Sequence, residues 1–349
     1  MLFKKLSTDK KQYQIIKEID FEELLNLPLA SSEEVKYLNQ FSFIRTIKLI
    51  IKRFLIDKIN LFLKKKINYN SQREIENVKS KYDKISGDYI DLFYNDDKDK
   101  RIDSAVIKSS TVFNHFENKI YIRGGKSVDP TINIVSQFCN NYDLKSLLEV
   151  GAGELTTLFP IVKKTNSLKF VSALDLSLNR LKHGKEFLKK QGMNINQYVA
   201  CDASNIPYKD NSFDIIFTQE CIEQVPLLAK KIIDEMIRVS SKYVVIIEPS
   251  YEFSNKITRN RILHKGFPIL EKKHYENKKS KIIYRDGLPF TRYELYEELV
   301  ILEKINKIDG DPVLLHPITK EKIEITEEFA IFGDNKVKLK DGIFDLSDL

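Results

Sequence analysis

The sequence predicts an α/β protein built on a doubly wound, largely parallel sheet. The first observation is the stretch LLEVGAGELTTL at residues 147–158, where short apolar residues lead into Gly151 and Gly153 and a helix-compatible run follows. Glycine suits such a turn because a side chain would keep the backbone away from a ligand, and the exposed N–H groups of the helix start favour polar or anionic groups. Leu155 or Thr156 stands where a third glycine would belong, so the stretch taken alone also fits a plain strand-to-helix turn.

The second observation is a series of apolar runs after the glycine turn, which predict the next strands. The run FVSALDL at residues 170–176 ends in Asp175. This acid stands about 20 residues after the glycines, where a carboxylate can accept both hydroxyls of a ribose. A third run, residues 197–201, precedes Asp202, and a fourth spans residues 213–217.

Helix signals stand between these strands. Ser177 is suited to cap a helix at residues 178–190, and Pro226 stands where the next helix should begin. That helix leads to residues 243–248, a continuous apolar run of the kind that is covered on both faces of a sheet. Its last residue, Glu248, should reach the carboxyl-end rim where ligands of such sheets bind.

The order of five motifs allows a family to be named. EVGAG, ALDLS, ACDASNIPY, SFDIIFTQECIEQV and YVVIIEPS follow one another over roughly residues 120–250. In this order and spacing they resemble the class I S-adenosylmethionine-dependent methyltransferases. The resemblance implies a Rossmann-like sheet and S-adenosyl-L-methionine as cofactor.

The resemblance also implies which residues bind the cofactor. Glu149 would lie near the methionine amino group, Asp175 would bind the ribose, and Gln219 would line the methionine side. Arg123 has two interpretations, a clamp for a carboxylate of the cofactor or of an acidic substrate, and a surface arginine at a turn. The complete set of expected cofactor-binding residues is Glu149, Gly151, Gly153, Asp175, Leu176, Asp202 and Ala203 flanking adenine, Gln219 and Arg123.

The chain departs from the family pattern after the fourth strand. Many relatives carry a histidine there, in a run like L-E-H, whereas this chain has Ile222, Glu223 and Gln224. Glutamine cannot act as a general base, so a mechanism through that histidine is not available. The catalytic candidates that remain at the rim are Glu220, Glu223 and Glu248, each of which also fits a helix-start or solvated carboxylate.

Residues 1–110 predict a helical N-terminal extension. Within it, residues 41–67 place apolar side chains on one helical face and basic side chains on the other. Two interpretations stay open, a helix packed on its own domain and a helix lying on an anionic membrane surface. A second periodic stretch, residues 75–93, occupies the position at which relatives carry a helical cover over the site.

After the methyltransferase core at residues 111–250 we expect a lid-like insertion and helix at residues 251–305. The helix is predicted over residues 291–302 from its periodicity. Residues 306–349 predict a small β module that resembles the zinc-ribbon-like activator domain of methyltransferases, or else a plain β extension. The metal-binding cysteines of that domain are absent and His316 alone cannot form a tetrahedral site, so no zinc is expected.

Composition limits which partners and cellular locations are expected for the protein. The chain of 349 residues carries 57 Lys and Arg against 50 Asp and Glu, a mild excess that does not imply nucleic acid as partner. The three cysteines are not spaced as metal ligands or as a disulfide framework, and the first residues contain no apolar core of a signal peptide. Both observations predict a cytoplasmic protein. If the protein contacts a membrane peripherally, we expect the contact at the inner face. The predicted activity is in-line methyl transfer to a small molecule or an envelope- or glycan-type precursor. The alternatives are a tRNA or protein acceptor and a catalytically inactive, cofactor-binding partner subunit.

Overall fold

The computed structural model describes residues 70–94, 111–114, 119–122, 130–288, 290–292, 296–308 and 310–347, together with the single positions 19, 29, 32, 36 and 47. The amphipathic stretch at residues 41–67 lies outside the described residues apart from Ile47. Within the described part, no helix is long and apolar enough to cross a membrane.

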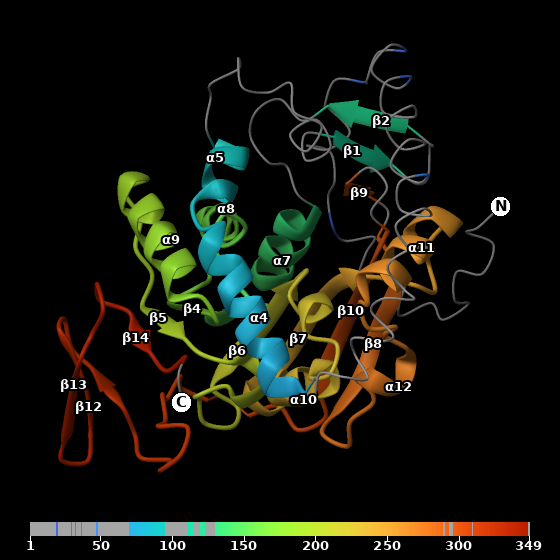
Figure 1. Ribbon diagram of the computed structural model, residues 1–349. Coiled ribbons are helices and arrows are strands. Elements are labelled where there is room, and N and C mark those ends of the chain that lie inside the picture. The colour runs from blue at the N-terminus through green and yellow to red at the C-terminus, as the bar shows by residue number, and fades with distance from the viewer. Residues whose placement is uncertain are drawn as a thin grey trace.

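An eight-stranded sheet forms the centre of the molecule (Figure 1), with strand order β14-β5-β4-β3-β6-β7-β10-β8. Every pair from β14 to β7 is parallel, and β10 runs antiparallel to both of its neighbours. The predicted doubly wound α/β fold is therefore confirmed. The strands are β3 (Ser146–Val150), β4 (Phe170–Asp175), β5 (Gln197–Ala200), β6 (Phe213–Gln219), β7 (Ser240–Pro249), β8 (Ser280–Gly287), β10 (Glu297–Lys304) and β14 (Phe344–Asp345).

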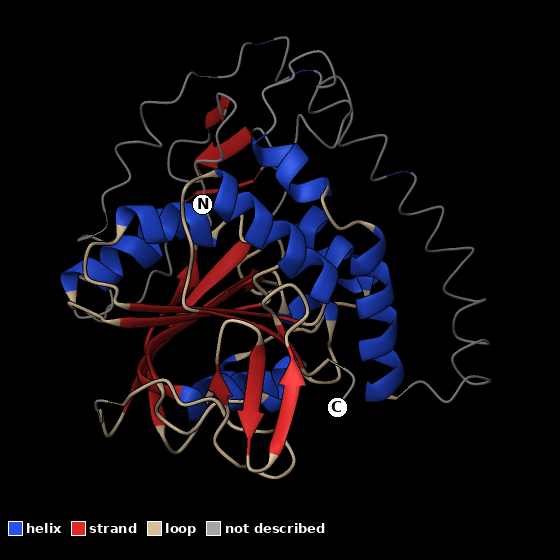
Figure 2. Cartoon of the chain, turned by 90° about the vertical axis from the view of Figure 1, so that its left-hand side faces the viewer, coloured by secondary structure: helices blue, strands red, loops and turns tan. Residues whose placement is uncertain are grey.

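Helices cover both faces of this sheet (Figure 2). On β3, Leu147 belongs to one apolar cluster, whereas Leu148 and Val150 belong to the other, because neighbouring side chains of a strand point to opposite faces. The first cluster includes side chains of α7 (Pro130–Asn141), α8 (Leu158–Lys164) and α9 (Leu178–Lys190), and the second includes those of α10 (Ala229–Val239) and α12 (Lys272–Tyr275).

Local capping signals account for the helix boundaries. Helix α9 spans the predicted residues, and the Oγ of Ser177 accepts a hydrogen bond from Arg180 N at 3.2 Å, as an N-cap does. Helix α10 begins at Ala229 and not at Pro226, because a short 3₁₀ helix, η3 (Ile222–Gln224), and a turn come first.

The prediction of a helix over residues 291–302 is wrong. Residues Glu297–Lys304 form β10, which pairs with β7 on one side and β8 on the other. A strand buried on both faces loses its polar–apolar alternation, so a short apolar run does not distinguish it from a helix. The central sheet therefore continues beyond residue 250, and β8 and β10 lie in the segment expected to be a lid-like insertion. Helix α11 (Lys256–Lys265) also lies in this segment.

The periodic stretch at residues 75–93 forms two helices. They are α4 (Ser71–Lys84) and α5 (Asp88–Tyr94), separated at Gly87, which has a φ of 100° that favours glycine. The next strands in the chain are β1 (Thr111–Asn114) and β2 (Lys119–Ile122). Together with the later strand β9 (Phe290–Arg292) they form a small sheet with order β2-β1-β9.

The C-terminal residues form a small antiparallel sheet of β11 (Glu324–Ile325), β12 (Phe329–Phe332) and β13 (Asn335–Lys338). Strand β14 then returns to the central sheet beside β5 (Figure 1). The ring of His316 stacks on Phe332 with 4.7 Å between centroids, and its Nδ1 accepts a hydrogen bond from Thr319 N. Among the described residues, no group of three or more His, Cys, Asp or Glu is arranged to hold a metal ion.

Leu155 occupies the position of the missing third glycine with a φ of 60°. A glycine at this position would let the next helix pack closely on the turn. Here the glycine is on that helix instead, because Gly184 of α9 lies against Leu155 and Glu154. A Cβ at Gly184 would lie 2.6 Å from the Cγ of Leu155 and 2.8 Å from the carbonyl carbon of Glu154. The glycine that lets the turn and the helix meet is therefore on the helix.

We expect Gly184→Ala to lower the free energy of unfolding by about 1–3 kcal/mol. Alanine normally stabilises a helix interior by about 1 kcal/mol relative to glycine, but here the new methyl group would collide with backbone. Urea denaturation measures the effect. Glu186→Ala, at an exposed position of the same helix, is the control and should stay within about 0.5 kcal/mol of the parent. A Gly184→Ala protein as stable as the parent would contradict this account of the packing.

Candidate active site

The glycine turn after β3 is shaped by two left-handed residues. Gly151 has a φ of 76° and Gly153 a φ of 54°. A Cβ on Gly151 would lie 2.5 Å from the Sγ of Cys221, so the end of β6 packs directly on the turn. Both backbone conformation and close approach therefore require glycine at position 151.

Asp175, at the end of β4, links the glycine turn after β3 to the start of α9. Its Oδ2 accepts a hydrogen bond from Gly153 N and its Oδ1 one from Ser177 N, both at 2.8 Å. Each carboxylate oxygen keeps a second lone pair, so the side chain can still accept hydrogen bonds from ligand hydroxyls. Asp202, at the end of β5, accepts hydrogen bonds from the N and Oγ of Ser204 and caps the short helix η2 (Ala203–Asn205).

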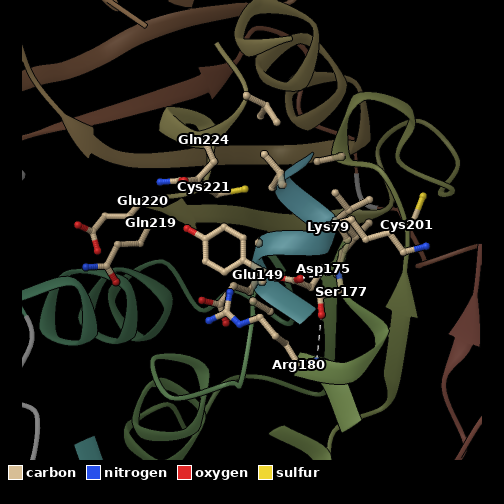
Figure 3. A pocket seen from close by; sticks show the side chains of 18 of the residues that line it. Lys79, Glu149, Asp175, Ser177, Arg180, Cys201, Gln219, Glu220, Cys221 and Gln224 are labelled. Atoms are coloured by element: carbon tan, nitrogen blue, oxygen red, sulfur yellow. Dashed lines mark hydrogen bonds between the residues drawn. The ribbon is translucent and has the colours of Figure 1, made fainter. Parts of the chain in front are cut away.

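These residues surround a pocket at the carboxyl ends of β3 to β6 (Figure 3), with an empty volume of about 1120 Å³ that includes its open mouth. Seven of the expected cofactor-binding residues line it, namely Glu149, Gly151, Asp175, Leu176, Asp202, Ala203 and Gln219. Gly153 does not line the pocket, because the guanidinium of Arg180 lies over it. Arg123 lies outside the described residues.

Helices α4 and α5 form a roof over the pocket. Its apolar and aromatic side chains are Ile75, Val78, Tyr82, Tyr89 and Phe93. The periodicity predicted helices here, but it did not indicate which of these side chains would face the site. The helical cover expected over residues 75–93 corresponds to this roof, whereas Arg180 is a functional candidate that sequence reasoning missed. Arg180 carried no signal because arginine in the first turn of a helix is usually solvated.

Hydrogen bonds attach the roof to the core at several points. Glu74 Oε2 accepts from Leu227 N at 3.1 Å, and Lys81 Nζ donates to Gln224 Oε1 at 2.9 Å. On α5, Ile90 N donates to Glu154 Oε2 at 2.9 Å. The roof is therefore held over the ends of several strands.

Glu149 is the acid that fits a cationic group of a ligand. The residue is 3% exposed, and its Oε2 has no hydrogen-bond partner among the described residues. Burial and the nearby charge of Asp175 raise the pKa of Glu149, while the charge of Arg180 acts in the opposite direction. A buried carboxylate oxygen without a donor costs free energy, and an ammonium group in the pocket would remove that cost.

The three catalytic candidates occupy different environments. The carboxylate of Glu248 accepts hydrogen bonds from the backbone N–H groups of Cys221, Ile222 and Glu223. Glu223 does not line the pocket; its Oε1 accepts a hydrogen bond from the side chain of Gln224, which does. Glu220 lines the pocket directly, beside Gln219 at the end of β6 (Figure 3).

Gln224, in the place of the usual histidine, is held on both sides. Its amide nitrogen donates to Glu223 and its carbonyl oxygen accepts from Lys81. Its amide is thereby oriented at the pocket wall, where it has no proton-accepting role to play.

Residues 148–246 match the family described as "Methyltransferase domain". This part of the chain is a class I S-adenosylmethionine-dependent methyltransferase domain. The methyltransferase domain begins within β3 and ends within β7, so it contains the glycine turn and the acids at the ends of β4 and β5. The cofactor of the domain is S-adenosylmethionine, and the unpartnered Glu149 and the glycine turn fit it.

A curated relative is norajmaline N-methyltransferase of Rauvolfia serpentina, 34% identical over 125 residues, which are 34% of this chain and 42% of that protein. The chain thus spans less than half the length of this relative. Among solved structures, an S-adenosylmethionine-dependent methyltransferase from Aquifex aeolicus is 18% identical, with 51% of this chain and 94% of that chain covered and a TM-score of 0.37. Geranyl diphosphate C-methyltransferase from Streptomyces coelicolor A3(2), in complex with Mg²⁺, geranyl diphosphate and S-adenosyl-L-homocysteine, is 12% identical, with 47% and 73% covered and a TM-score of 0.38. The family assignment rests on the sequence match over residues 148–246.

We expect Glu149→Gln to separate cofactor affinity from stability. The amide keeps the shape of the side chain but removes the buried charge, so the denaturation midpoint should stay equal or rise. The affinity for S-adenosylmethionine should fall about 10- to 100-fold, because the ammonium loses a charge-assisted partner. Isothermal titration calorimetry and urea denaturation measure the two effects, with Glu186→Gln as control. Unchanged affinity would contradict the role assigned to Glu149.

Glu223 should make stability depend on pH. Burial raises its pKa from 4.5 to about 7, against the opposing effects of Arg261, the Gln224 hydrogen bond and Lys81. Between these two values the folded state keeps a proton that the unfolded state has lost, so stability falls as pH rises through this interval and levels off above it. The stability lost over the interval is on the order of a few kcal/mol, since each pH unit corresponds to ~1.4 kcal/mol.

In Glu223→Gln this pH-dependent loss should be absent. Urea denaturation of both proteins at pH 5, 6, 7 and 8 measures it, and the variant should gain stability relative to the parent as pH rises. Parallel curves at all four values would show that the Glu223 carboxyl titrates normally.

Proposed function

We propose that this protein transfers the methyl group of S-adenosylmethionine to a small-molecule acceptor. The observation that carries the proposal is the apolar roof of α4 and α5 above the polar floor of the pocket. A pocket with apolar walls and a few convergent polar groups is typical of small-molecule sites.

The chemistry required of the protein is modest. When bound, S-adenosylmethionine supplies a methyl group activated by a positively charged sulfur. The residues of the chain have to orient the acceptor in line, exclude water and, for a hydroxyl or amine acceptor, accept a proton. The roof side chains Tyr82, Tyr89 and Phe93 serve to exclude water, and the acids of the floor hold polar groups.

Glu220 is the carboxylate that we propose for the acceptor side. It lines the pocket, whereas Glu223 and Glu248 do not. Glu220 also has a φ of 50°, a left-handed conformation that non-glycine residues rarely adopt and that is found often at functional sites. This backbone conformation supports a role in the site for its side chain.

Two other acceptor classes remain as outcomes of the test. A tRNA or protein acceptor rests on the resemblance of residues 306–349 to an activator domain. An envelope- or glycan-type precursor, and with it a contact with the inner face of the membrane, rests on residues 41–67, which apart from Ile47 lie outside the described residues. A catalytically inactive subunit that binds the cofactor is suggested by Gln224 in place of the usual histidine.

The test is methyl transfer from S-adenosylmethionine labelled in its methyl group to an extract of the source cells, separated afterwards into small molecules, lipid and glycan, RNA, and protein. We expect label among the small molecules. Label confined to RNA or protein would overturn the proposed acceptor class, and label in no fraction from a protein that binds the cofactor would favour the inactive subunit.

The same assay tests Glu220. Glu220→Gln should lower the transfer rate about 10²- to 10⁴-fold while calorimetry finds the cofactor affinity within about threefold of the parent, because the side chain acts on the acceptor. Glu186→Gln, on the surface of α9, should transfer at the parent rate. A normal rate in Glu220→Gln would remove Glu220 from the mechanism.

A further inference from the structure

Arg180 points its guanidinium into the cofactor pocket. It comes from the first turn of α9, lines the pocket, and has a side chain that is only 11% exposed (Figure 3). The guanidinium rests on the glycine turn, because a Cβ on Gly153 would lie 2.4 Å from one of its terminal nitrogens. Its position is thus beside the turn whose backbone passes along the cofactor.

Two aromatic rings of the roof hold this guanidinium. Its central carbon lies 4.9 Å from the ring centroid of Tyr82 on α4 and 4.7 Å from that of Tyr89 on α5. Both distances are within the range of cation–π contacts, so the planar group is fixed without any of its N–H donors being used.

None of the described residues accepts a hydrogen bond from the Arg180 guanidinium. The closest ion-pair contact, from Nε to the Oε1 of Glu154, measures 3.6 Å, and Nε has no hydrogen-bond partner. Burial acts to lower the pKa of Arg180, but interactions with nearby acidic groups, Asp175 first and Glu154 also, outweigh burial and raise it, so the group stays charged. The charge is thus balanced by nearby acids, but the N–H donors of the guanidinium have no hydrogen-bond acceptor among the described residues and are left for a ligand in the pocket.

Among the described residues, the pocket therefore holds two complementary groups without a hydrogen-bond partner, the carboxylate oxygen Oε2 of Glu149 and the guanidinium of Arg180. An acid without a donor fits an ammonium group, and a guanidinium without an acceptor fits a carboxylate, which it binds with two parallel hydrogen bonds. A ligand carrying both groups on one carbon, an α-amino acid, satisfies both. S-adenosylmethionine carries this zwitterion at its methionine end.

We propose that Arg180 binds the α-carboxylate of the cofactor's methionine moiety while Glu149 binds its α-ammonium, an inference that rests on the proposed function. Tyr82 and Tyr89 then serve as the support that fixes the plane of the guanidinium, and the roof contributes to cofactor recognition through them. Arg180 takes the role for which Arg123 was a candidate in the sequence.

The test is calorimetric binding of three ligands: S-adenosylmethionine, its decarboxylated form, which keeps the amine and the sulfonium, and 5′-methylthioadenosine, which lacks the amino-acid part. The parent protein should prefer S-adenosylmethionine over the decarboxylated form by about 10- to 100-fold. In Arg180→Met this preference should shrink to within about threefold or reverse, while 5′-methylthioadenosine binds as it does to the parent. Lys190→Met, at an exposed position of the same helix, should keep the parent preference.

The outcomes separate the two hypotheses. A parent protein that binds none of the three ligands would overturn the proposed function and this inference with it. Normal binding by the parent, with the full preference retained in Arg180→Met, would overturn the inference alone, as would an equal loss for all three ligands in a folded variant. If Arg180→Met no longer folds, Arg180→Lys decides, because it keeps the charge but lacks the planar fork and should show an intermediate preference.

Discussion

The site depends on the buried carboxylate of Asp175. Its two oxygens accept hydrogen bonds from Gly153 N and Ser177 N, so one side chain joins the glycine turn after β3 to the start of α9. The residue is 7% exposed, and an unpaired carboxylate at such a position would be costly, which makes the two backbone partners part of the fold. Because Arg180 belongs to the first turn of α9, the same link places its guanidinium over the turn. The floor of the pocket and its charged wall are therefore one unit.

The roof completes this unit from a distant part of the sequence. Helices α4 and α5 contribute the aromatic rings that hold Arg180, and they are bound in turn to Leu227, Gln224 and Glu154 of the core. The pocket acquires a polar floor and an apolar cover as a result. Such an arrangement strengthens each charge interaction inside it, since apolar surroundings lower the local dielectric constant.

Environment, not residue type, separates the glutamates around the pocket. Glu149 is buried with one oxygen unpartnered, Glu248 is held by three backbone N–H groups, and Glu223 is buried beside Gln224 with a pKa raised to about 7. Glu220 lies at the pocket surface. Desolvation, nearby charges and hydrogen bonds act on the same carboxyl group to different extents, so identical side chains are suited to different tasks.

The sequence by itself determined the features that depend on neighbouring residues: the glycine turn at Gly151, the cap at Ser177, strands β3 to β7 and the acids at their ends. Carboxyl ends of parallel strands meet at one edge, so Glu149, Asp175 and Asp202 could be expected in advance to lie together, and they line one pocket.

Only the tertiary structure decided the rest. Strand β10 was mistaken for a helix because burial on both faces removes the alternation by which a strand is recognised. Gly184 allows α9 to pack against Leu155, and the guanidinium of Arg180 lies on the rings of Tyr82 and Tyr89. Both contacts join segments that are far apart in the chain. Periodicity reports which side of a helix is apolar, but not which surface that side will meet, and the partners of a buried charge are set by packing alone.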